Sequence, residues 1–260
     1  MSNSIQELLT LAEKNDADAQ YELAEAYRLG EGAVQNNTEA LRWYLAAAEL
    51  GLADAQNNLG AMYLAGMGAN KNPQQAVHWY QKAAEQGQMH AQFNLAMLYL
   101  NGSGVEQSDD QAANWLHAAA EQCDLEAIYQ LGILYQQGLG VEKNVVTAAD
   151  LHTLAAIEGH LEAIDKLAEY QEELEEEALR GSIQAAISMA KKYDHGLGIE
   201  PDTAQCYAWL QWARLHGTHD EDEDELEELE NYVNAVTNED EIEHGKKLLN
   251  EMRGRADDMI

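Results

Sequence analysis

The chain has 260 residues, of which 47 are Asp or Glu and 15 are Lys or Arg, so its formal net charge is −32. A surface this acidic repels phosphate backbones and argues against nucleic-acid binding. No run of about 18 apolar residues predicts a membrane span, and the first residues lack the pattern of a secretory signal. Two cysteines, Cys123 and Cys206, give no disulfide framework. We therefore expect a cytoplasmic protein that binds neither nucleic acid nor membranes.

A pair of glycines separated by one residue recurs along the chain, for example in LAGMGANKNP, which ends at Pro73. This stretch is not a phosphate-binding P-loop, because Asn70 and Asn72 flank Lys71 where Gly and Ser or Thr are needed. The pairs are Gly30/Gly32, Gly66/Gly68, Gly102/Gly104, Gly138/Gly140 and Gly196/Gly198, and the first four are 36 residues apart. A catalytic loop normally occurs once, so five copies indicate the architecture of a solenoid.

The expected elements follow this repeat in chain order. Residues 1–15 predict an N-terminal capping helix, and residues 16–217 predict the repeat array. The full copies are 16–51, 52–87, 88–123, 124–159 and 182–217, and 160–181 is a degenerate copy without the glycine loop. Each full copy predicts two helices, because its apolar residues recur at helical spacing. Residues 218–260 predict an acidic segment followed by C-terminal capping helices.

Helix ends are marked by residue type in every full copy. In residues 52–87, the first helix should run from about Asp54 to Ala65 and stop at Gly66, which accepts a left-handed conformation. The second should begin after Asn72, a good N-cap. Equivalent caps are Asn36, Ser108, Asn144 and Asp202, and Glu39, Gln75, Gln111 and Gln205 stand three residues after four of the five caps. Those four copies predict reciprocal capping boxes.

The packing between helices is expected to depend on rows of alanines at equivalent positions. One row is Ala19, Ala55, Ala91, Ala127, Ala163 and Ala185, and another is Ala47, Ala83, Ala119, Ala155 and Ala213. The tryptophans Trp43, Trp79, Trp115 and Trp209 should fill the space between neighbouring pairs. After the array, Leu226, Leu229, Val233 and Val236 predict one helical stripe, and a last helix is expected to start at Thr237 with Asp240.

Together these patterns resemble the Sel1-like repeat, an offshoot of the tetratricopeptide repeats. The resemblance is carried by A-x-x-x-L-G-x-x-Y-x-x-G-x-G, a capped helix and then A-x-x-W-Y-x-x-A-A-E-x-G, and it covers residues 16–217. It implies an all-α fold, a right-handed α/α superhelix with helical caps, in which the first helices line a concave groove.

Three patterns that invite a chemical interpretation are weak. Asp220, Asp222 and Asp224 match the start of an EF-hand loop, but Glu225 and Asn231 stand where Gly and Glu are required. His216 and His219 with Asp220 have no further metal ligand nearby. Ser188 and Lys191 match the S-x-x-K of penicillin-recognising enzymes, without the partner motifs K-T-G or S-D-N. We expect no metal, no cofactor and no catalytic residue.

The resemblance places a candidate groove on the first helices. Its proposed partner-binding residues are Tyr21, Glu22, Asn57, Asn58, Phe93, Asn94, Met97, Tyr129 and Gln130. Amides beside aromatic rings suit recognition of a peptide backbone. The competing interpretation is that Tyr21, Phe93 and Tyr129 only pack between adjacent first helices.

Three functions remain open from the sequence. The first is a monomeric, non-enzymatic adaptor that binds a segment of another protein in the groove. The second is an acidic partner that neutralises a basic toxin or effector, a role that the resemblance to bacterial immunity proteins with such repeats permits. The third is a β-lactam hydrolase that uses Ser188. The net charge itself fits a basic partner, general solubility or adaptation to a salty cytoplasm.

Overall fold

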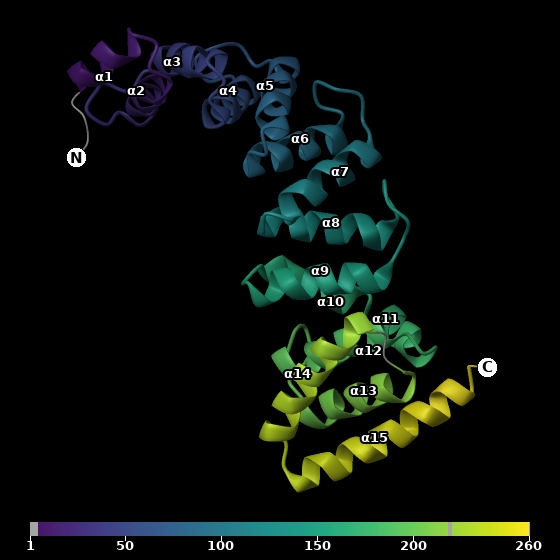
Figure 1. The fold of residues 1–260 in the computed structure, drawn as a ribbon. Helices are drawn as coiled ribbons and strands as arrows, with labels where there is room; N and C mark the ends of the chain where they lie inside the picture. Colours follow the sequence, from purple (N-terminus) through teal and green to yellow (C-terminus); the bar gives the residue numbers. More distant parts are fainter. Residues whose placement is uncertain (1–4, 218–219, 260) are drawn as a thin grey trace. The chain divides into compact units, whose positions relative to one another are not determined.

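The structure, a computed structural model, describes residues 5–217 and 220–259, and every regular element in those residues is an α-helix. The chain divides into two units: residues 1–127 with 139–141, and residues 128–138 with 142–260. The helices are drawn in Figure 1. The prediction of an all-α array of helix pairs is therefore confirmed.

The first unit holds α1 to α7. Their bounds are α1 Ile5–Ala12, α2 Ala17–Leu29, α3 Asn37–Glu49, α4 Ala53–Ala65, α5 Pro73–Glu85, α6 Met89–Asn101 and α7 Asp109–Ala120. Helix α1 packs on α2, and each later pair packs internally and on its neighbour, α3 on α4 and α5 on α6. Helix α8, Leu125–Gln137, begins in this unit and continues into the second.

The second unit holds most of α8 and all later helices. Their bounds are α9 Val145–Ile157, α10 Leu161–Glu169, α11 Gln171–Leu179, α12 Ile183–His195, α13 Thr203–Leu215, α14 Asp220–Val236 and α15 Glu239–Asp257. Helix α9 packs on α10, α11 and α12, and α13 packs on α12, α14 and α15.

The two glycines of each loop have different roles. Gly66 ends α4 in the left-handed region at φ +73°, and its N–H donates to the Met62 carbonyl. Gly68 is also left-handed, and a Cβ there would lie 2.2 Å from the Asn37 carbonyl oxygen at the start of α3. The second glycine therefore lets the loop of one repeat touch the second helix of the preceding repeat. The loop therefore contacts the preceding repeat as well as connecting two helices of its own, and this structural role explains why the glycine pair recurs along the chain.

The N-caps are confirmed, but the capping boxes are wrong. The side chain of each predicted cap accepts from an amide N–H in the first turn of its helix; for Asn72 the donor is Gln75 N–H at 3.1 Å. The reverse bond is missing because the cap's own N–H already donates to the carbonyl of a tyrosine in the first helix. The pairs are Asn36–Tyr27, Asn72–Tyr63, Ser108–Tyr99, Asn144–Tyr135 and Asp202–Tyr193.

Both alanine rows lie in the core. Ala55, Ala83 and Ala155 are fully buried, and Ala19, the most exposed member, retains 4% of its surface. Trp43, Trp79 and Trp209 are buried as expected, whereas Trp115 is only half-buried. Alanine at these positions lets the helices approach closely, and the larger rings fill the remaining volume.

In residues 160–181 the two helices are short and are joined directly at Tyr170. No glycine ends α10, so its last carbonyls need other donors. Lys192 supplies one: its buried ammonium donates to the Leu167 carbonyl at 2.8 Å. The equivalent residues in the other copies are Ala26, Met62, Leu98 and Leu134. A buried lysine has replaced an apolar residue where the helix end is unusual.

The C-terminal helices differ in detail from the prediction. The cap of α15 is Asn238, not Thr237, and it forms a true capping box with Glu241 rather than Asp240. The predicted cap was wrong by one residue, because the Thr237 hydroxyl donates to the Val233 carbonyl in the last turn of α14. In the α14 stripe, Leu226 and Val233 are buried, but Val236 is 49% exposed.

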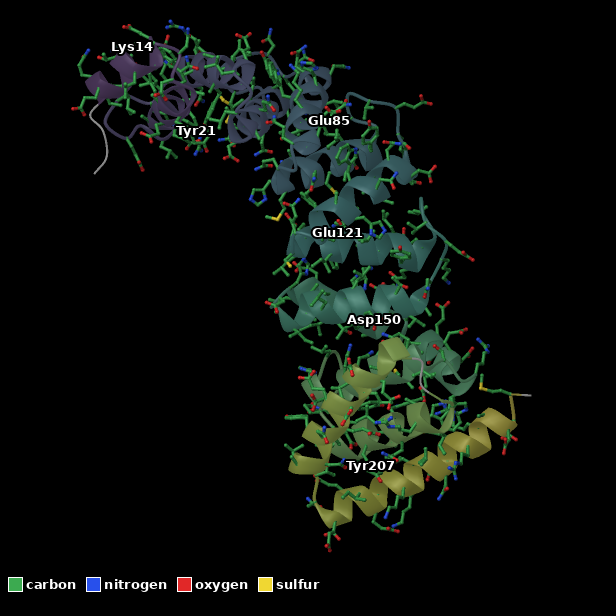
Figure 2. The ribbon with its side chains drawn as sticks, in the orientation of Figure 1. Lys14, Tyr21, Glu85, Glu121, Asp150 and Tyr207 are labelled. Carbon is green, nitrogen blue, oxygen red and sulfur yellow. The ribbon has the colours of Figure 1, made fainter. Side chains whose placement is uncertain are left out.

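Helix α15 packs closely on α13. A Cβ on Gly245 would lie 2.7 Å from the ring of Tyr207, which Figure 2 labels.

Candidate partner-binding surface

A cluster of polar groups joins α2 and α3 in the first unit. Tyr44, fully buried on α3, donates its hydroxyl to Glu25 on α2. Arg28 donates to Glu25 at 2.5 Å and to the Tyr44 oxygen at 3.2 Å. Hydrogen bonding to Glu25 raises the pKa of Arg28, and burial raises the pKa of nearby Tyr21. The cluster therefore fixes the position of the Glu25–Arg28 ion pair on α2, the first helix of its repeat.

The predicted asparagines extend this cluster across the repeats. The Asn58 amide donates to Glu25 at 3.1 Å and to the hydroxyl of Tyr21 at 3.3 Å. Asn57 donates to the Asn58 oxygen at 3.4 Å, and Asn94 donates to the Asn57 oxygen at 3.1 Å. All three asparagines are half-buried. The amides thus form a continuous hydrogen-bonded chain from α2 through α4 to α6.

The remaining predicted residues of the first unit lie beside this chain or outside it. Phe93 and Met97 on α6 are half-buried, so part of each side chain is open to solvent. Glu22 is exposed and no hydrogen bond of its side chain is recorded among the described residues. Tyr21, labelled in Figure 2, contacts the Tyr44 ring edge-on at 5.7 Å between centroids. The Tyr21 ring therefore packs on the second helix of its own repeat, and its hydroxyl belongs to the polar chain.

Tyr129 and Gln130 lie on α8 in the second unit and are half-buried. The Tyr129 ring stacks on His160, with 4.3 Å between centroids, and contacts His152 at 5.4 Å. The Tyr129 carbonyl lies 3.1 Å from the buried Nε2 of His152, and His152 Nδ1 lies 2.6 Å from the Tyr170 hydroxyl. Desolvation lowers the pKa of His152 to about 4. Tyr129 therefore makes ring contacts with two histidines of its own unit, and its role in binding a partner stays a prediction.

Glu25, Arg28 and Tyr44 were missed as members of the candidate site. Glu25 occupies a groove position in the repeat register, but Tyr44 belongs to the second helix, which the family resemblance does not assign to the groove. A tyrosine recurs at this position only in the next copy, as Tyr80. Repeat register alone could not show that its hydroxyl reaches across to α2.

Two of the three weak chemical patterns gain little from the structure, and the side chains of Asp220 and Asp222 in the third lie outside what the structure describes. Ser188 is fully buried and donates to Asp150 and to the Gln184 carbonyl, so its hydroxyl is not exposed for attack on a substrate. His216 packs on Trp212 and its Nδ1 bonds the Trp212 carbonyl at 2.9 Å, while His219 lies outside the described residues. Among the described residues no group of three His, Cys, Asp or Glu could hold a metal ion.

No helix of residues 5–217 and 220–259 combines the length and the low polarity that crossing a bilayer requires.

Comparison with family models finds five Sel1 repeats, at residues 17–52, 53–88, 90–122, 125–160 and 183–217. No protein with a curated description matches by sequence. Among solved structures, a Sel1 repeat protein from Oxalobacter formigenes is 30% identical with a TM-score of 0.57, over 82% of this chain and 79% of that one. A protective antigen present in uropathogenic Escherichia coli strains, which displays an SLR fold, is 28% identical with a TM-score of 0.64. The match covers 84% of this chain but half of the antigen.

An immunity protein from Pseudomonas aeruginosa also matches, at 20% identity and a TM-score of 0.40 over 82% of this chain and 73% of that one. A similarity at this level says nothing about what the chain binds.

Proposed function

Because the chain belongs to the Sel1 repeat family, we propose that it is a non-enzymatic scaffold that binds a segment of another protein. The proposed site is the surface of α2, α4 and α6, the first helices of the repeats in the first unit, which we call the first-helix face. Sel1 repeat proteins are generally protein-interaction scaffolds. Fold alone does not determine function, so the proposal rests on the residues of that face.

The observation that carries the proposal is the hydrogen-bonded chain of Asn58, Asn57 and Asn94. Each amide has its orientation fixed by a neighbour, so little side-chain entropy would be lost when a partner binds. Asn94 is the last member, and the Asn57 contact uses only its nitrogen. Its carbonyl oxygen is available to accept a main-chain N–H of an extended segment.

Apolar area lies next to these polar groups. Phe93 precedes Asn94 on α6 and Met97 follows one turn later, and both are half-buried. Aromatic and methionine side chains are enriched at the centre of protein interfaces, where they supply contact area. The amides would fix the register of the bound segment, and Phe93 with Met97 would supply apolar contact.

The proposal is tested by capturing partners on the immobilised protein and measuring their affinity for a double variant, Asn58→Ala with Asn94→Ala. The matched control is Asn114→Ala, an exposed asparagine on α7, a second helix of the same unit. We expect the double variant to bind at least about tenfold more weakly and the control to bind as the wild type does. Thermal melts of both variants check that the fold is retained. An affinity within twofold of wild type would remove this surface as the site.

A second candidate function, neutralisation of a basic toxin or effector, is favoured by the distribution of charge. The second unit has 30 Asp and Glu against ten Lys and Arg. Binding through this charge would be fast and strongly weakened by salt, because exposed charges are screened. A captured basic protein that is released by high salt from both wild type and the Asn58/Asn94 double variant would support this function over the first.

A further inference from the structure

The repeats of the first unit provide an internal comparison along the first-helix face. Three positions lie about one turn apart on one side of each first helix, and they are equivalent from repeat to repeat. They carry Asp18, Glu22 and Glu25 on α2, Asp54, Asn58 and Ala61 on α4, and His90, Asn94 and Met97 on α6. Neither α4 nor α6 contains Lys or Arg. The face therefore changes from acidic at α2 to a surface without carboxylates at α6.

The Asp18 carboxylate lacks the contact that its equivalents make. Gln88 donates to Asp54 at 3.2 Å, and Asp124 lies 3.6 Å from the Nδ1 of His90. Both contacts come from the residue just before the next first helix, and in the first repeat that residue is Leu52, whose side chain cannot hydrogen-bond. Asp18 and Glu22 are exposed, and within residues 5–217 and 220–259 neither forms a hydrogen bond or an ion pair.

The basic residues of the first unit are engaged elsewhere. They are Lys14, Arg28, Arg42, Lys71 and Lys82. Arg28 is paired with Glu25, so its charge is already balanced. Figure 2 labels Lys14 at the opposite edge of the unit from Tyr21, the residue before Glu22. The other three lie on second helices or in a loop. The negative charge of Asp18 and Glu22 therefore remains for a partner to balance.

The acidic end and the apolar end belong to one surface. The Asn58 amide donates to Glu25, one turn from Glu22, and the Asn94 amide donates to Asn57. These bonds connect α2 to α4 and α4 to α6. Phe93 and Met97 flank Asn94 on α6, and both are half-buried. A segment that crosses the three helices would meet carboxylates first and apolar side chains last.

The dimensions of the face set the length of that segment. Packed helices lie about 8–10 Å apart, so the two steps from α2 to α6 span about 20 Å. An extended chain advances about 3.3 Å per residue, and its side chains alternate between two sides. Contacts at Glu22 and at Met97 are then about six residues apart along the segment, an even spacing that places both side chains toward the protein.

We propose that the first-helix face binds an extended segment of about seven residues, with lysine or arginine at one end and a large apolar residue at the other. The basic side chain lies against Asp18 and Glu22, the main chain bonds Asn94, and the apolar side chain packs on Phe93 and Met97. This inference rests on the proposed function, which assigns the face, and it adds the chemistry of the segment and the helix on which each end lies.

The test is an NMR titration of the labelled protein with synthetic heptapeptides. One peptide has arginine first, leucine seventh and alternating serine and alanine between them, and a second has the reversed sequence, so that both chain directions are tried. The tighter binder is also made with glutamate for arginine and with serine for leucine.

Two protein variants change the acidic end, and one serves as a control. Asp18→Asn with Glu22→Gln removes both carboxylates, and Glu22→Arg reverses the charge. The matched control is Glu49→Gln with Glu85→Gln, which removes two exposed carboxylates at the ends of second helices α3 and α5. The control changes the net charge by the same amount as the removal variant, so it corrects for the long-range field of the protein.

We expect the arginine peptide to bind the removal variant about fivefold or more weakly than wild type, and the control within about twofold. The serine-for-leucine peptide should lose about tenfold and no longer shift the signals of Phe93 and Met97. The glutamate peptide should bind Glu22→Arg more tightly than it binds wild type, which a purely structural role of Glu22 would not produce.

Equal affinities of the arginine and glutamate peptides for wild type, equal losses in the removal and control variants, or no binding in either chain direction would overturn the proposal. Its failure is distinguishable from failure of the proposed function. If a captured protein depends on Asn58 and Asn94 but not on Asp18 and Glu22, the face binds protein and only the assignment of the segment is wrong.

Discussion

At the scale of single residues, buried Gln20 lacks, within the described part of the chain, a hydrogen bond that the equivalent glutamines of the next two repeats form. Buried Gln56 donates to the Ala48 carbonyl at 3.0 Å and accepts from Gln86 at 2.7 Å. Gln92 accepts from Gln122 in the same way, at 2.7 Å. Gln20 is the equivalent residue of the preceding copy, and its buried carbonyl oxygen has no partner among the described residues. The donor is missing because position 50 is a leucine, which is 51% exposed.

Leu50→Gln should therefore stabilise the protein. The new amide can donate to Gln20, as Gln86 does to Gln56, which is worth about 0.5–1.5 kcal/mol. Urea unfolding measures the change, with Leu50→Ala as the control that removes leucine without adding a donor. Equal stability of the glutamine and alanine variants would show that the bond does not form.

His152 makes stability depend on pH. Its folded-state pKa of about 4 lies below the ordinary value of 6.5, mainly because burial disfavours the charged ring. The unfolded chain therefore binds the proton more readily, and the contribution of neutral His152 is complete above pH 6.5 and is lost as pH falls toward 4. The full loss, reached once the pH is below about 4, is about 3 kcal/mol.

The check is His152→Leu, which places at 152 the residue type of the equivalent Leu116. Between pH 6.5 and 4 the unfolding free energy of the variant should fall by less than that of wild type, although its stability at pH 7 is altered by loss of the Tyr170 contact. Parallel curves for the two proteins would contradict the buried, neutral state of His152.

At the scale of elements, the loops hold successive repeats together through close backbone contact. Gly104 is left-handed at φ +77°, and a Cβ there would lie 2.4 Å from the Pro73 carbonyl carbon of the preceding repeat. Gly87 is left-handed at φ +86°, but a Cβ there would meet nothing within 4 Å. Comparing alanine substitutions at Gly87 and Gly104 therefore separates the cost of backbone strain from the cost of disturbing the contact between repeats.

Gly87→Ala should cost only the strain of a left-handed alanine, about 1–2 kcal/mol. Gly104→Ala should cost more, about 3 kcal/mol or above, because backbone must also move away from backbone. Denaturant unfolding of the two variants gives the comparison. Similar losses in both would mean that the loop does not hold the neighbouring repeat.

Much of the helix pattern could be predicted because its signals are local. Asn72, Pro73 and Gly66 each act through their own backbone position, and copies of them repeat in register. The capping boxes failed because the cap N–H bonds a tyrosine carbonyl that lies nine residues earlier, as in Asn72–Tyr63. The hydrogen bond from Lys192 to the end of α10 could not be predicted either, because its acceptor, the Leu167 carbonyl, lies 25 residues away in sequence.

At the scale of the whole molecule, the candidate site was predicted in part. Repeat register placed Asn58 and Asn94 at one position of the first helices. It could not show that Asn57 links them, because that depends on how each side chain turns within its helix. It also left Tyr129 open between binding and packing; the ring stacks on His160, which the register could not show. The repeat pattern does not identify the partner.

The central claim is that the first-helix face of the first unit binds another protein, and site-specific photocrosslinking tests it most directly. A photoreactive phenylalanine analogue replaces Phe93 on α6, and a control places the same group at Gln81, an exposed residue of second helix α5. On irradiation in the native cell, position 93 should give a discrete adduct with another protein that position 81 does not give. The absence of an adduct at 93, or the same adducts from both positions, would contradict the claim.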